Sequence, residues 1–268
     1  MNGYTFHLTY DFKTGLKDKS LMLMNYLFPL AFLAMAGLFM AQINPFFTEL
    51  MVPGMVVFAV MSSALLNLSS TMITEREAGI YRSYRVNGVR AVSLVTIPVA
   101  GHLIHAFLVS VIITVLSILV FGGTAPVHWG WFFLVFILVS LSLSTFGLLI
   151  GIVSPSQRAG LLFAQGFYIP SVVLSGIMVP QDMIPENLNF LVSLLPATHG
   201  IRGFEAFAME SSVSTYAGAV SLAVLAASIL VNLVLCLKLF QWEDKSEVKP
   251  KRFMALIACV PFILSIVI

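Results

Sequence analysis

The chain has 268 residues, of which 59% are hydrophobic and 10% are charged, with a mean hydropathy of +0.99 and a net charge of +2. Soluble domains are about 45–50% apolar, so this composition excludes a water-soluble fold. The basic residues are spread along the chain rather than gathered in one patch, which argues against a nucleic-acid partner.

The first element in chain order is a stretch of mixed character. Leu8, Phe12 and Leu16 share a helical face, and nearby lysines suit anionic headgroups, which is typical of a helix that lies in the membrane interface. The apolar residues from Phe6 to Phe12 also alternate with a period of two, so an extended start is the alternative. We expect an N-terminal interfacial helix within residues 4–19.

Six apolar runs follow, each about 20 residues or longer, which is the length that a helix needs to cross roughly 30 Å of hydrocarbon. Every backbone polar group in hydrocarbon must be paired within the chain, and a helix pairs its own. We therefore expect an all-α membrane protein with a six-helix transmembrane bundle. The predicted spans are residues 21–41, 50–73, 94–121, 129–153, 160–180 and 215–240.

The basic residues between these runs indicate the orientation of the bundle. Thirteen of the fourteen Lys and Arg residues fall before the first span, at the end of the last span or after it, or in the loops 74–93 and 154–159. The loops on the opposite side, 42–49, 122–128 and 181–214, contain a single basic residue, Arg202. Because Lys and Arg resist translocation, we expect a multi-pass protein of the plasma membrane with a cytoplasmic N-terminus.

The loop after the second span carries charges of both signs. An ordinary loop that follows the positive-inside rule is one interpretation, but such a loop would not need two glutamates. The other interpretation is a short cytoplasmic helix near residues 75–88 with a function of its own. Its candidate residues are Glu75, Arg76, Glu77, Gly79, Arg82 and Arg85.

Five of the polar side chains within the predicted spans are candidates for a functional role. His102 and His105 share a helical face, but a metal site normally needs three or four ligands, so we expect no metal. Hydrogen bonds between helices, worth about 0.6–2 kcal/mol each, are one explanation, and a translocation pathway is the other. The five residues are Asn67, His102, His105, Gln165 and Asn232.

Two further patterns concern packing and the outer loops. Gly147 and Gly151, near the inner end of the fourth span, have the spacing that lets two helices approach closely. The outer segment 181–214 contains an apolar stretch, 188–195, which is too short to cross a bilayer. We expect outer re-entrant helices near residues 181–210.

Residues 253–268 form a last apolar stretch after a basic linker. At 1.5 Å per residue they reach about 24 Å, which is short of a comfortable crossing. Two interpretations of this stretch stay open: a thin or tilted seventh span, and a segment held in a groove of the protein. We expect a transmembrane domain over residues 1–245, followed by this linker and tail over residues 246–268.

The order of these features resembles that of ABC-2 type transporter permeases. The sequence Glu75-Arg76-Glu77-x-Gly79 is similar to the loop that in this family forms the coupling helix and docks on an ATP-binding subunit. The outer segment is similar too, with His199 where Tyr is common in the family. The residues that stand at the positions of the family's outer re-entrant turn are Gly176, Pro180, Pro185, Pro196 and His199. The resemblance covers residues 1–245 and implies two partners, an ATP-binding cassette subunit and a second permease chain, either identical or similar.

The chain has no GxxxxGK[ST] phosphate-binding loop, so we expect ATP on the partner subunit and no cofactor in this chain. Nothing in the spans suggests catalysis, so we expect a transport subunit rather than an enzyme. It would export a hydrophobic or amphipathic substrate such as a drug, an antibiotic, a lipid or a glycan. The alternatives are an ion-driven secondary transporter, which would need carboxylates inside the spans, and a membrane scaffold or sensor, which would need a sizeable soluble domain.

Overall fold

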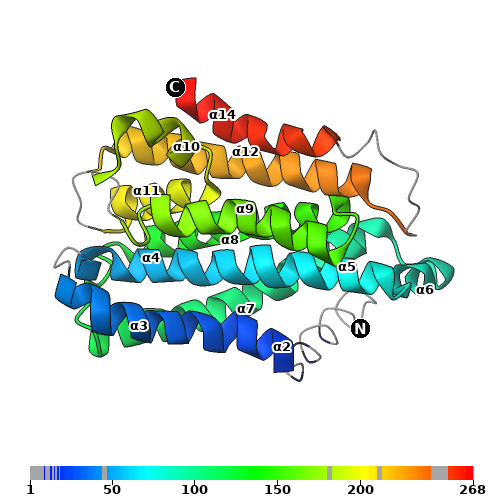
Figure 1. Ribbon diagram of the computed structural model, residues 1–268, viewed down its shortest axis with the longest axis horizontal. Coiled ribbons are helices and arrows are strands. Elements are labelled where there is room, and N and C mark those ends of the chain that lie inside the picture. The colour runs from blue at the N-terminus through cyan, green and yellow to red at the C-terminus, as the bar shows by residue number, and fades with distance from the viewer. Residues whose placement is uncertain are drawn as a thin grey trace.

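The computed structural model describes residues 9, 13, 15, 17, 19–43, 47–179, 183–209, 213–242 and 253–267. No β-strand occurs in these ranges, and long helices lie side by side along the long axis of the molecule (Figure 1). The all-α class is therefore confirmed. The elements are α2 (Lys19–Met22), η1 (Leu23–Leu27), α3 (Phe28–Ile43), α4 (Phe47–Ser62), η2 (Ser63–Leu68), α5 (Ser69–Glu77), α6 (Ile80–Val86), α7 (Ala91–Leu119), α8 (Trp129–Val153), α9 (Gln157–Leu174), η4 (Glu186–Leu188), α10 (Asn189–Ser193), α11 (Pro196–Phe207), α12 (Thr215–Leu239), η5 (Phe253–Cys259) and α14 (Val260–Val267).

Five helices within the described ranges are long and apolar enough to cross a membrane. They lie at Leu23–Met40, Phe47–Glu77, Ala91–Leu119, Trp129–Val153 and Thr215–Leu239, and they coincide with five of the predicted spans. The predicted span 160–180 corresponds to α9, which has 18 residues and ends at Leu174. Gln157, Arg158 and Gln165 make α9 less apolar than the other five helices, so a sixth crossing stays a prediction.

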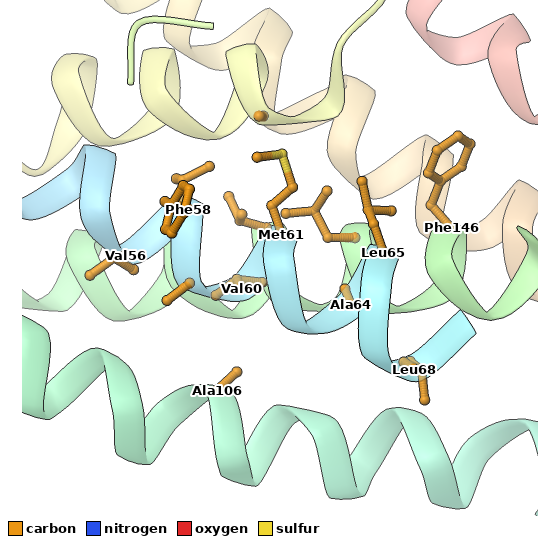
Figure 2. Close-up of a cluster of buried hydrophobic side chains, with 14 of the residues drawn as sticks. Val56, Phe58, Val60, Met61, Ala64, Leu65, Leu68, Ala106 and Phe146 are labelled. Atoms are coloured by element: carbon orange, nitrogen blue, oxygen red, sulfur yellow. The ribbon is translucent and has the colours of Figure 1, made fainter. Parts of the chain in front are cut away.

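The centre of the bundle is the continuous helix that α4 and η2 form. Every side chain from residue 51 to residue 65 is buried, and Figure 2 shows Phe58, Met61 and Leu65 among the surrounding helices. This helix contacts α7, α8 and α9, and α4 also contacts α3 and α11. A helix that is apolar on all sides is expected to be buried on all sides.

Helix α8 approaches η2 and α5 very closely. A Cβ atom on Gly147 would collide with the backbone carbonyl oxygen of Ala64, and a Cβ on Gly151 would lie 2.8 Å from the Cβ of Met72. Glycine at both positions therefore lets the two backbones come this near. The packing role predicted for Gly147 and Gly151 is confirmed.

The two ends of the molecule carry different short helices. Helix α6 lies at one end of the long axis, and α10 and α11 lie towards the other end (Figure 1). The C-terminal helices η5 and α14 run beside α12, and α14 also contacts α10. Ala258 and Phe262 are buried in this contact, whereas most of the other apolar side chains of the tail are exposed, so a seventh span and a segment held in a groove both stay open.

Two predictions fall on residues that the structure describes barely or not at all. The interfacial helix within residues 4–19 is described only at Thr9, Lys13, Gly15, Lys17 and Lys19. The boundary at residue 245 lies outside the described residues.

Candidate functional site

The turn between α5 and α6 is fixed by a buried tyrosine. Gly79 has a φ of 73°, a left-handed conformation that glycine adopts without strain, and the chain turns there from α5 into α6. The buried hydroxyl of Tyr81 donates a hydrogen bond to Oε2 of Glu75 at 3.0 Å. Burial and the Glu75 carboxylate both raise the pKa of Tyr81, so the phenol keeps the proton that it donates. Since its ring also lies 5.4 Å from that of Phe240, just after α12, α6 is tied to both α5 and α12.

Arg76 connects the same turn to α8. Its guanidinium is buried and donates hydrogen bonds to the carbonyl oxygens of Gly151 at 3.1 Å and Ile152 at 2.9 Å, and also to that of Ser154. The last carbonyl groups of a helix have no partner within the helix, and α8 has no basic residue in its own last turn. Arg76 therefore caps α8 from α5, whereas the sequence suggested a residue that contacts a partner.

The remaining predicted coupling residues lie on the outside of the turn. Glu77, Arg82 and Arg85 are exposed, and Val86 is 82% exposed. We refer to these four side chains as the α6 surface. It combines charges of both signs with an apolar tip at the end of the molecule.

Three of the five predicted intramembrane residues meet around one small cavity. Asn67, His102 and His105 all line a cavity of about 70 Å³ between the start of the first span, η2–α5 and α7. The amide nitrogen of Asn67 donates to Oδ1 of Asn25 at 2.9 Å, and Nδ1 of His105 lies 2.7 Å from the hydroxyl of Tyr26. We refer to this group as the polar cluster.

His102 is held from two helices. Its Nε2 lies 2.7 Å from the hydroxyl of Ser63 and its Nδ1 lies 2.7 Å from the hydroxyl of Ser144. A neutral imidazole carries one N–H, so one serine accepts from the ring and the other donates to it. No three His, Cys, Asp or Glu side chains in the described ranges are placed to hold a metal ion together.

The polar cluster coincides with two π-helical turns. Asn25 and Tyr26 belong to η1, and Ser63 and Asn67 belong to η2, both of which are π-helical. Wide turns of this kind are often found at functional sites. Here they place polar side chains of two adjacent spans against each other.

The other two predicted intramembrane residues lie elsewhere. Asn232 is fully buried in α12, and neither atom of its amide has a hydrogen-bond partner among the described residues. Gln165 is half-buried on α9. Neither of them lines the cavity of the polar cluster.

The predicted outer turn is spread over three short segments. Gly176 is buried after the end of α9 with a φ of 101°, a conformation that requires glycine. Pro185 is exposed before η4, and Pro196 is the first residue of α11, where its missing N–H costs nothing. Pro180 lies outside the described residues.

His199 joins four elements on this side of the molecule. Its Nε2 donates a hydrogen bond of 2.9 Å to the carbonyl oxygen of Ser193, the last residue of α10. Its Nδ1 lies 3.3 Å from the hydroxyl of Ser221 in α12. Its ring lies 5.7 Å from that of Phe262 in α14. Burial lowers the pKa of His199 to about 4, and Arg202 contributes to the decrease, so the imidazole is neutral at pH 7.

Several residues of these sites were not predicted from the sequence. Asn25, Tyr26, Ser63 and Ser144 complete the polar cluster, and Tyr81 fixes the α5–α6 turn. Tyr26, Ser63, Ser144 and Tyr81 carry no distinguishing signal in the sequence. Asn25 does carry one, because it is an amide within the predicted span 21–41, as Asn67 is within the second span.

Comparison with known proteins gives a family and a relative. A model of the family described as "ABC-2 type transporter" matches residues 6–209. The chain is also 30% identical over 159 residues to ABC transporter G family member 20 of Dictyostelium discoideum. This match covers 58% of the chain and 21% of that protein, so the chain spans about a fifth of the length of the relative.

Proposed function

Since the chain belongs to the ABC-2 type transporter family, we propose that it is the membrane-spanning permease subunit of an ATP-driven exporter. No phosphate-binding loop occurs in these 268 residues, and our proposal places ATP hydrolysis on a separate ATP-binding cassette subunit. The permease pairs with a second copy or a similar chain in the plasma membrane. Helix α9 supplies a sixth crossing, and α10 and α11 are the outer re-entrant helices.

The observation that carries this proposal is the way in which the α6 surface is connected to the spans. The bond between Tyr81 and Glu75 fixes α6 to α5, and the bonds from Arg76 fix α5 to the end of α8. A force applied to α6 therefore reaches two long helices through charge-assisted hydrogen bonds. A loop that only satisfied the positive-inside rule would not need such a joint.

The proposed mechanism is a rigid-body movement. ATP closes the two cassette subunits, which move the α6 helices, and α5 and α8 follow because of the joint at Arg76. The spans then part towards the outer side and release the substrate. Few charges lie within the spans, so the substrate is hydrophobic or amphipathic.

The test is transport by the complex in lipid vesicles. The chain is purified with the ATP-binding cassette protein from a neighbouring reading frame, and ATP-dependent export is measured. Replacing both Arg82 and Arg85 with Glu should abolish copurification and export while thermal stability is unchanged, because both side chains are exposed. Arg90→Glu is the matched control, since Arg90 is exposed outside α6.

Two outcomes contradict the proposal. Transport driven by an ion gradient without the ATPase would indicate a secondary transporter. Equal loss of function in the control and in the α6 double variant would show that the α6 surface has no special role.

A further inference from the structure

A second cavity, distinct from the polar cluster, lies between α8, α9 and the C-terminal tail. It has a volume of about 390 Å³. An apolar cavity of about 150 Å³ already holds a benzene molecule and stays free of water. The side chains that line the cavity here are apolar apart from one cysteine, and they include Phe146, Leu149, Phe163, Phe167, Leu256 and Cys259.

The mouth of this cavity is continuous with the lipid-facing surface. Phe163 on α9 and Leu256 on η5 both line it, and they are 53% and 67% exposed. Leu162 and Phe253 beside them are 72% and 75% exposed. Exposed apolar side chains of this size on a membrane helix contact hydrocarbon, so the cavity opens to acyl chains rather than to water.

The position and the charge near the cavity indicate which lipid enters. Val153 and Pro155, at the end of α8, line the cavity, so it lies at the end of the bundle where α9 begins and α12 ends. Lys238, in the last turn of α12, is exposed, whereas Arg158, in the first turn of α9, lines a different cavity together with Ser69 and Ser70. The helices α8, α9, α12, η5 and α14 contain no Asp or Glu, and the linker 243–252 that joins α12 to η5 has four basic and three acidic residues. The charge of these segments is therefore positive on balance, which attracts a phosphate.

We propose that the cavity binds one acyl chain of an anionic phospholipid, with the head group at the level of Lys238. The occupant is a lipid of the bilayer, not the exported substrate, so this inference does not depend on the proposed function. The bound chain fills the space that the loose contact between α8 and the tail leaves. The lipid thereby becomes part of the packing of η5.

The test is photo-crosslinking of the full chain in nanodiscs. Phosphatidylglycerol that carries a diazirine in the middle of one acyl chain is the probe, and labelled residues are mapped by mass spectrometry. Labelling of Phe167 and Cys259 should exceed that of Leu230, a 67% exposed residue of α12, by several-fold. Equal labelling of all three residues would overturn the proposal.

Matched tryptophan variants test whether the cavity itself is the site. Ala255 lines the cavity, so Ala255→Trp should fill it and remove the excess labelling. Ala227→Trp, on the exposed side of α12, should leave the labelling unchanged. Excess labelling that persists in Ala255→Trp would contradict the proposal.

The native cysteines provide a measurement that needs no substitution. Cys259 lines the cavity, whereas Cys236 is fully buried, so alkylation by a maleimide in detergent reports on Cys259. Added phosphatidylglycerol should slow this alkylation several-fold. An unchanged rate would contradict the proposal.

Two further arms identify the ligand. A phosphatidylcholine probe should label the cavity less than the phosphatidylglycerol probe. Lys238→Gln should remove that difference, whereas Arg158→Gln should keep it, because Arg158 lines another cavity. Equal labelling by both probes in the wild type would overturn the anionic head group. Displacement of the probe by an exported compound but not by unlabelled phosphatidylglycerol would show a substrate site and overturn the proposal. A crosslink from the cavity to a second copy of the chain would also overturn it.

Discussion

Helix α8 is built differently on its two sides. Towards η2 and α5 the backbones meet at Gly147 and Gly151, and Arg76 closes the contact at its inner end. Towards α9 and η5 the contact consists of larger apolar side chains and includes a cavity of about 390 Å³. We call the first contact the glycine seam and the second contact the loose side.

The difference shows what holds helices together in lipid. Moving an apolar side chain from lipid to another helix gains little, because the lipid tails are just as apolar. Backbone contact at small residues and hydrogen bonds are therefore the specific forces, and the glycine seam has both. The loose side has large apolar side chains that lipid can replace, so we expect the seam to be rigid and the loose side to be adaptable.

The largest expected effect comes from breaking the glycine seam. In Gly147→Ala the new methyl group would meet the backbone of Ala64, which cannot rotate away, so we expect a loss of about 3 kcal/mol in the free energy of unfolding. Reversible unfolding in mixed micelles measures this loss. The matched control is Gly166→Ala in α9, where a Cβ would have no atom of the described residues within 4 Å. Equal stability of the two variants would contradict a rigid seam.

The next effect concerns the inner end of the seam. Arg76→Met keeps the length of the side chain but leaves the carbonyl groups of Gly151 and Ile152 without these donors, and we expect a loss of about 2 kcal/mol. The same unfolding assay measures it. Arg85→Met is the control, since an exposed residue should change stability by less than about 0.5 kcal/mol. If Arg85→Met were equally destabilising, the loss would reflect the charge of the loop and not the cap on α8.

Near the C-terminal tail, the free energy of unfolding should depend on the protonation of His199, whose ring lies beside Phe262. Its pKa is about 4 in the folded chain against an ordinary value of 6.5, so the unfolded state binds the proton more readily and stability falls as the pH decreases from about 6.5 to 4. Between pH 7.5 and 5.5 this amounts to about 1.4 kcal/mol.

Comparing the wild type with His199→Gln isolates this contribution, because the other histidines are the same in both proteins. The decrease in the free energy of unfolding between pH 7.5 and 5.5 should be smaller in the variant by about 1.4 kcal/mol. An identical pH dependence of the two proteins would show that the imidazole is not held in its neutral form.

The smallest effect is expected at a single hydrogen bond between α8 and α12. The hydroxyl groups of Ser142 and Ser228 are 2.6 Å apart and buried. Such bonds within membranes contribute about 0.6 kcal/mol on average, so the coupling energy from Ser142→Ala, Ser228→Ala and the double variant should be of that size. A coupling energy as large as the effect of Gly147→Ala would mean that polar pairs, rather than backbone contact, dominate the packing of α8.

The sequence predicted the features that depend on local pattern. Five spans follow from the length and apolarity of their runs, and the close approach at Gly147 and Gly151 follows from the spacing of the two glycines. The limit was reached at α9, which begins at Gln157 and ends at Leu174 rather than spanning 160–180. Ser156 caps its start, and Gly176 leaves the helical conformation soon after its end.

Features that depend on the distance between segments were not predictable. Arg76 has the same charge and lies in the same loop as Arg82, yet one caps α8 and the other is exposed. The difference arises because α5 ends beside the last turn of α8, a neighbourhood that one sequence does not reveal. Asn25 and Asn67 pair for a similar reason, since both π-helical turns must form before the two amides meet.

The wide turn of η2 has a consequence for changes in chain length. A π-helical turn contains one residue more than an α-helical turn needs, so one residue removed within Ser63–Leu68 can be absorbed by a return to α-helical geometry, at the expense of the polar cluster. One residue removed within α5 would instead rotate Arg76 by about 100° around the helix axis and take it away from the end of α8. A deletion of one residue should therefore be tolerated in η2 and not in α5.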